Sequence, residues 1–171
     1  MLPPPVFWLR GWPYATRRIA GLLFRPEHYL EAASDRLNEA LLLHGRANFA
    51  AAIYFAGVGV ECLLRAYRVR DNTVFDARHD LAELLRQSRL LSFVEPSDSR
   101  ITAAALGEVW SHWKNDYRYA SNARLLSEFK QLKLHRDTRG DQLKAASSAV
   151  IDAAFTLLTK GRQRWTISQA D

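Results

Sequence analysis

Apolar residues recur at spacings of three and four along most of the chain, and this periodicity is the feature that most constrains its fold. Between Pro26 and His44 the series with this spacing is Leu30, Ala33, Leu37, Ala40 and Leu41, and acidic residues fall on the other side. Such spacing gathers apolar side chains on one face of an α-helix. No segment shows the sustained alternation of a β-strand bounded by turn signals. We therefore expect an all-α bundle of about five helices.

Start and stop signals set the expected helix boundaries. Pro26 followed by Glu27 is typical of a helix start, because proline fits the first turn and a carboxylate favours the positive end of the helix dipole. Ser97 is expected to cap a later helix, and Thr138 with Asp141 resembles a capping box. The predicted helices span residues 26–44, 46–69, 78–91, 97–120 and 138–161, with a shorter helix over 123–132.

The segment 46–69 is predicted to be the central helix, because it is apolar on nearly every side. Gly57 and Gly59 each weaken a helix by up to about 1 kcal/mol relative to alanine. Close packing against a neighbouring helix would offset that loss, so we expect a close approach there. The longest stretch without charge, Ala47 to Val60, is shorter than the roughly 20 residues that cross a bilayer, and no membrane span is expected.

The length of 171 residues fits one domain. The predicted parts are an apolar and basic arm (1–25), a helical bundle (26–165) and a tail (166–171). Cys62 is the only cysteine, so a disulfide framework is excluded and a reducing cytoplasm is expected. Arg10 interrupts the apolar arm and no cleavage pattern follows it, so we expect an ordered or partner-bound arm rather than a signal peptide. The aromatic residues of the arm are Phe7, Trp8, Trp12 and Tyr14.

The net charge of +6 comes mostly from arginine, whose planar guanidinium binds phosphate with two hydrogen bonds. The basic residues gather in three places along the sequence: Arg65, Arg68 and Arg70, then Lys130, Lys133, Arg136 and Arg139, then Lys160, Arg162 and Arg164. These clusters predict a phosphate-binding surface for RNA or a nucleotide. Cations near helix C-termini also stabilise the helix dipole, so part of the pattern needs no ligand.

The sequence contains no recognisable metal-binding or cofactor-binding motif. The five histidines are scattered, and none has a histidine or cysteine partner at ligand spacing: they are His28, His44, His79, His112 and His135. No phosphate loop or nucleophile elbow is present. His112 and Asp116 are four residues apart, and an ordinary hydrogen bond on one helix face is the expected reading of that pair.

A few polar residues stand on otherwise apolar helices, namely Glu61, His79, Asp80, Arg118 and Tyr119. A buried carboxylate at position 61 must find a partner or lose its charge, and Arg118 or Arg65 could supply an ion pair that fixes the helix register. Trp110, Trp113 and Tyr117 have helical spacing, which favours a place in the core over a base-stacking platform.

Three motifs in order resemble the HEPN superfamily of helical bundles, over residues 29–119. The run from Ala56 to Ala66, which contains Glu61, Leu64 and Arg65, resembles that family's "A-x-x-x-x-E-x-x-L-[KR]-A" helix. His79, Asp80 and Leu81, followed by Leu84, are similar to its "H-[DN]-L-x-x-L" helix, and Tyr117-Arg118-Tyr119 looks like its "[YF]-R-Y" ending. The resemblance implies a dimer of helical bundles with a role in toxin and antitoxin, antiviral or nucleotide-linked systems.

Many members of that family cleave RNA without a metal, using an arginine followed after four to six residues by a histidine. Here no histidine has an arginine at that distance before it. Without such an imidazole, proton transfer at the ribose 2′-hydroxyl loses its usual acid and base. A less efficient site could still use Arg118 with Tyr119, Asp116 or His112.

Three hypotheses remain open from the sequence. The first is a non-catalytic domain that binds RNA, a nucleotide or a protein partner in a polar cleft shaped by Glu61, Arg65, His79, Asp80 and Arg118. The second is a diverged, metal-independent RNA-cleaving toxin. The third is a scaffold whose aromatic arm docks on a partner subunit, with a homodimer as the simplest assembly.

Overall fold

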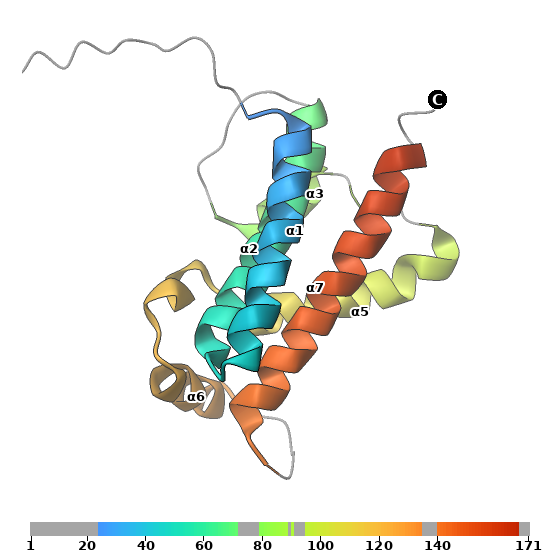
Figure 1. Cartoon of the computed structure of the whole chain (residues 1–171). Coiled ribbons are helices and arrows are strands. Elements are labelled where there is room, and N and C mark those ends of the chain that lie inside the picture. Colours follow the sequence, from blue (N-terminus) through green and yellow to red (C-terminus); the bar gives the residue numbers. More distant parts are fainter. Residues whose placement is uncertain (1–23, 72–78, 89, 91–94, 135–139, 168–171) are drawn as a thin grey trace, which may run out of the picture.

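The computed structural model of the chain describes residues 24–71, 79–88, 90, 95–134 and 140–167. Within those ranges the chain forms six α-helices, one 3-10 helix and no strand, which confirms the all-α bundle. In chain order they are α1 (Pro26–Gly45), α2 (Phe49–Asp71), α3 (Leu81–Ser88), α5 (Pro96–His112), the 3-10 helix η1 (Asn115–Tyr119), α6 (Asn122–Gln131) and α7 (Gln142–Ile167) (Figure 1).

Helix α2 is the centre of the bundle, as its all-round apolar sequence predicts. It packs against α1, α3 and α7, and most of its side chains are buried. Its largest fully buried residues are Ile53, Val60, Leu63, Leu64 and Tyr67. By length and composition α2 could cross a membrane, but 72 % of its apolar window is buried inside this bundle, as in the core helix of a folded domain.

The turn between α1 and α2 is held by a side chain from another helix. Ala47 adopts a positive φ of 57° there, and α2 begins at Phe49, three residues later than predicted. The amide of Asn122, at the start of α6, accepts a hydrogen bond from the Ala50 N–H (2.8 Å) and donates one to the Ala47 carbonyl (2.8 Å). Helix α6 is thereby fixed to the closed end of the α1–α2 hairpin.

The predicted close approach at the two glycines of α2 is confirmed. A Cβ on Gly57 would lie 2.0 Å from Cδ1 of Trp113, and a Cβ on Gly59 would lie 3.0 Å from the carbonyl oxygen of Ala33 on α1. Gly57 therefore makes room for a tryptophan ring, and Gly59 lets two helix backbones approach.

The fourth predicted helix is shorter than expected. It ends at His112 instead of continuing to residue 120, because Trp113 and Lys114 are extended and η1 follows them. The Trp113 indole turns toward α2, where its Nε1–H donates to the Tyr54 carbonyl (3.0 Å). At the other end, Glu95 is the N-cap residue and Pro96 the first helical residue, so the predicted cap at Ser97 is wrong.

The last helix is longer than expected, since it passes Gly161 and continues to Ile167. A Cβ on Gly161 would lie 2.7 Å from Leu63, and the carbonyl of Gly161 accepts a hydrogen bond from the Tyr67 hydroxyl (2.6 Å). Gly161 is therefore a packing position and not a helix stop. Asp141 caps this helix by accepting from the N–H groups of Leu143 and Lys144 (both 3.0 Å), while Thr138 lies outside the described residues.

Candidate functional site

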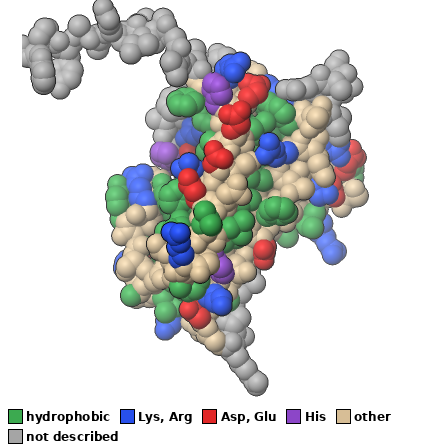
Figure 2. All heavy atoms as spheres, viewed as in Figure 1, with side chains coloured by type: hydrophobic (Ala, Val, Ile, Leu, Met, Phe, Trp, Pro, Cys, Tyr) green, Lys and Arg blue, Asp and Glu red, His purple; other side chains and the backbone are tan. Residues whose placement is uncertain are grey.

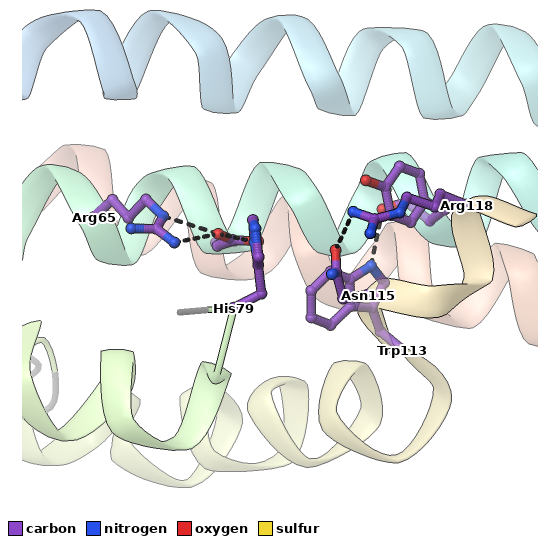
Figure 3. A network of polar contacts seen from close by, with 7 residues as sticks. Arg65, His79, Trp113, Asn115 and Arg118 are labelled. Carbon is purple, nitrogen blue, oxygen red and sulfur yellow. Dashed lines mark hydrogen bonds and ion pairs between the residues drawn. The ribbon is translucent and has the colours of Figure 1, made fainter. Parts of the chain in front are cut away.

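A buried ion pair and a histidine meet where α3 begins beside α2. Oε1 of Glu61 accepts from both Nε and Nη2 of Arg65, each at 2.8 Å, one helical turn further along α2. The same oxygen lies 2.8 Å from Nδ1 of His79. The Glu61 and Arg65 side chains are only 6 % and 8 % exposed, whereas His79 is 47 % exposed (Figure 3). The carboxylate thus holds one edge of the imidazole and leaves the rest accessible.

The residue after His79 fixes this arrangement from the α3 side. Oδ1 of Asp80 accepts from the N–H groups of Ala82 (2.9 Å) and Glu83 (3.1 Å), so Asp80 caps the helix. An aspartate cap satisfies helix N–H groups that lack internal partners. Asp80 therefore has a structural role that sets where His79 lies.

The predicted pairing of Glu61 with Arg118 is wrong, and the alternative partner, Arg65, is the one observed. Arg118 is exposed on η1, where its Nη1 donates to Oδ1 of Asn115 (3.3 Å). Its guanidinium also lies over the Tyr119 ring, 4.7 Å from the centroid. The early end of α5 accounts for the difference, because η1 directs Arg118 along the surface instead of into the bundle.

An open cleft of about 600 Å³ lies between the start of α3 and the turn that joins α5 to η1. Its lining includes His79, Asp80, Trp110, Trp113, Lys114 and Asn115. The Trp110 side chain is half exposed at this cleft (51 %), so its predicted place in the core is wrong, while Trp113 and Tyr117 are buried as expected. Figure 3 shows Asn115 and Arg118 beside Trp113, nearer to the start of α2 than His79 is.

Lys114 separates this cleft from a second, more polar cavity of about 540 Å³. The lysine Nζ lies 2.8 Å from Oε1 of Glu128, and the Tyr117 hydroxyl donates to the same oxygen (3.1 Å). These hydrogen bonds lower the pKa of Glu128, with that from Lys114 having the larger effect. Burial raises the pKa of Tyr117, and the charge on Glu128 raises it further.

Of the residues proposed for a diverged catalytic site, His112 is buried, whereas Asp116 is exposed and lines the second cavity together with Tyr119. His112 is buried at the end of α5, with Nδ1 3.1 Å from the Glu108 carbonyl and Nε2 3.4 Å from the Leu134 carbonyl. Asp116 lies on η1 and not on the helix of His112, so the predicted hydrogen bond between them is wrong. Tyr119 is 78 % exposed beside Arg118 and faces the second cavity.

The predicted phosphate-binding surface is divided. Arg68 is buried, and Arg70 lies over the rings of Tyr67 and Trp165 at 4.9 and 4.8 Å from their centroids. Lys130 and Lys133 are exposed at the end of α6, near the opposite end of the bundle (Figure 1). Arg136 and Arg139 lie outside the described residues. The arginines that end α2 therefore pack within the bundle and do not extend the surface of α6.

Sequence reasoning did not identify Trp110, Lys114 or Asn115 as site residues. Two signals were present: the aromatic residues Trp110, Trp113 and Tyr117, for which a base-stacking platform was the less favoured alternative, and the polar run Lys114-Asn115-Asp116 directly after Trp113. Across the described ranges, no three histidine, cysteine, aspartate or glutamate side chains are grouped so as to hold a metal ion. The cleft offers instead an aromatic face, an amide, an imidazole, a carboxylate and the ammonium of Lys114, which is paired with Glu128, with the exposed Arg118 bonded to one of its lining residues.

No family model, curated protein or solved structure matches this chain. The described residues form an all-α helical bundle with an aromatic and polar cleft beside a buried Glu61–Arg65 pair.

Proposed function

We propose that this chain is a HEPN-like domain that binds nucleotide units of single-stranded RNA in the cleft between α3 and the α5–η1 turn. The observation that carries the proposal is the half-exposed Trp110 ring in a cleft that Lys114 and Asn115 also line. An exposed tryptophan is a stacking platform for a base, and lysine and arginine attract the phosphate backbone.

Asn115 and Arg118 support the same proposal. The Asn115 carbonyl oxygen is held by Arg118, and among the described residues its amide nitrogen has no acceptor, so it could donate to a base or ribose oxygen. Arg118 is exposed and already stacks on Tyr119, which is typical of guanidinium groups at nucleic-acid surfaces. These groups come from one short segment, residues 110–119, whose course is set by the contact of Trp113 with Gly57.

The resemblance adds support of a different kind. Its three motifs contribute Glu61, His79 and Arg118, and of these His79 lines the cleft while Arg118 bonds to Asn115, another lining residue. We therefore propose a cytoplasmic role in a toxin–antitoxin or antiviral defence system, with the family's dimeric assembly.

Titration of a fluorescently labelled single-stranded RNA, followed by anisotropy, tests the proposal. Replacing Trp110 by alanine should weaken binding by about 10- to 100-fold, since stacking on an aromatic side chain contributes about 1 to 3 kcal/mol per base. Ile101→Ala is a matched control, because Ile101 is an equally exposed apolar residue on the same helix (52 %) and is not part of the cleft lining.

The proposal fails if the protein does not bind RNA, or if both variants bind as tightly as the wild type. Adenosine monophosphate as competitor separates a mononucleotide ligand from RNA. A mononucleotide site would be saturated by it, whereas an RNA surface would release little of the labelled strand.

Metal-independent RNA cleavage is a second candidate, favoured by the 2.8 Å contact between His79 and Glu61. A carboxylate on Nδ1 fixes the tautomer and leaves Nε2 as the acceptor, the arrangement of a general base. Incubating labelled RNA with the protein in chelator tests it. Cleavage products that form with the wild type but not with His79→Gln would support RNA cleavage. RNA that stays intact with the wild type would show that the cleft only binds it.

A further inference from the structure

The outer face of α1 carries an acidic stripe that leads to an apolar end. Glu27, Glu31 and Asp35 are exposed along it, and within the described residues none of them has an ion-pair partner. Leu41 and Leu42 follow toward the end of the helix, 50 % and 65 % exposed. Figure 2 shows this face of the molecule, with a row of acidic side chains along α1 and apolar side chains beyond it. We call these five residues the α1 face.

A neighbouring residue of α7 enlarges the apolar end. Phe155 is 60 % exposed on α7, which packs beside α1. The end of α1 is joined to the start of α7 by the contact of His44 Nδ1 with the Ser147 hydroxyl (3.0 Å), eight residues before Phe155. Large apolar side chains that are exposed on two packed helices favour a partner that covers them.

Residues 1–23 have the complementary composition in the matching order. Counting back from α1, Arg25 and Phe24 come first and belong to the described residues. Within residues 1–23 the first charged residues are then Arg18 and Arg17, and the aromatic residues Tyr14, Trp12, Trp8 and Phe7 follow, with Arg10 among them. On α1 the carboxylates likewise come first and the leucines later. A segment that turned back at Phe24 and ran along α1 would therefore bring arginine to carboxylate and aromatic ring to leucine.

We propose that residues 1–23 dock on the α1 face of the same chain in this reversed direction. The segment is long enough, because Leu42 lies about 24 Å along the helix from Pro26 at a rise of 1.5 Å per residue. Even with the same rise, the 17 residues from Phe24 back to Phe7 span about 25 Å. A second copy offering its own α1 face would bring no cation to the three carboxylates, whereas the arm brings Arg17 and Arg18.

Chymotrypsin cleavage of the full chain tests the docking, since the enzyme cuts after the aromatic residues of the arm and none of them is changed. Fragments that begin after Phe7, Trp8 or Tyr14 are timed by mass spectrometry, because the bond between Trp12 and Pro13 resists this enzyme. Reversing the stripe with Glu31→Lys and Asp35→Lys should speed their release about five- to tenfold, the size expected from losing two surface ion pairs. Arg17→Glu with Arg18→Glu should do the same.

Combining the four substitutions should restore protection, because the charges are again complementary. Asp116→Lys is a control, because it makes the same charge change on η1 that Asp35→Lys makes on α1. It should leave the rate of chymotrypsin cleavage in the arm unchanged. Cleavage of the wild type that is as fast as that of the charge reversals would overturn the proposal. Protection that increases with protein concentration would also overturn it, since the arm would then lie on a second molecule.

Discussion

The indole ring of Trp113 occupies the space that a side chain at Gly57 would need, with Cδ1 2.0 Å from the position of a Cβ there. This contact joins the middle of α2 to the residue at which α5 ends. Because Trp113 and its neighbours Lys114 and Asn115 line the cleft, one glycine on the central helix determines the shape of the proposed binding site.

Gly57→Ala should therefore destabilise the protein although alanine is the better helix former. Overpacking a rigid ring costs about 1 to 3 kcal/mol, which exceeds the gain of about 1 kcal/mol in helix propensity. Gly107→Ala is the matched control, since nothing lies within 4 Å of its Cβ position on α5, and it should raise the free energy of unfolding by about 0.5 to 1 kcal/mol. Urea denaturation measures the free energy of unfolding of both variants. A Gly57→Ala variant that is more stable than the wild type would contradict the close packing of Trp113 on Gly57.

Glu61→Ala should lower the free energy of unfolding by about 3 to 5 kcal/mol, because it removes the carboxylate that contacts two nitrogens of the buried Arg65. The double variant Glu61→Leu with Arg65→Met removes both charges and should recover much of the loss. Thermal or urea melts measure both. Equal melting of the wild type and Glu61→Ala would show that the pair contributes nothing to stability.

The helices that follow from local periodicity could be predicted from the sequence, whereas the residues that line the cleft could not. Helical spacing gave α1 and α2 to within a few residues, and the two glycines of α2 indicated close packing. The end of α5 depends instead on where Trp113 finds space on α2, a contact between residues more than fifty positions apart. Spacing alone predicts a helix that continues to residue 120, which makes Arg118 one of the two candidate partners of Glu61. Trp110 is within α5 as predicted, but it is exposed at the cleft instead of buried.

The partners of the charged residues also depend on tertiary structure and could not be predicted from local spacing. The sequence showed that Glu61 needed a cation and offered two, but the choice between Arg65 and Arg118 depends on the tertiary course of residues 113–119. Similarly, basic clusters that are separate in the sequence came to different ends of the bundle, and the sequence carries no local signal for that division.

Arg118→Ala should leave the melting temperature unchanged, since the side chain is exposed and has no contact with Glu61. If the proposed function is right, it should weaken RNA binding and reduce the slope of log affinity against log salt by about 1, as the loss of one phosphate contact would. Anisotropy titrations at several salt concentrations measure that slope. An unchanged slope and affinity would remove Arg118 from the binding surface.

Glu128 should contribute to stability at neutral pH and lose that contribution in acid. Its hydrogen bonds from Lys114 and Tyr117 lower its folded-state pKa. A lowered pKa gives stability that is fully present above the unfolded value of about 4.3 and is lost as the pH falls through the folded value. Melting temperatures between neutral pH and acid should fall less steeply in Glu128→Gln than in the wild type. Asp152→Asn is the control, because Asp152 is exposed on α7 and has no ion pair in the described residues. Identical curves for the wild type and Glu128→Gln would refute the expectation.

Photo-crosslinking tests the central claim, RNA binding in the cleft, most directly. Single-stranded RNA containing 4-thiouridine is irradiated with the full chain, and the attached peptide is identified by mass spectrometry. The account predicts attachment within residues 110–115 or 79–82, the two segments that line the cleft, and its loss in Trp110→Ala but not in Ile101→Ala. Attachment confined to the α6 end, at Lys130 or Lys133, or no attachment at all, would contradict it.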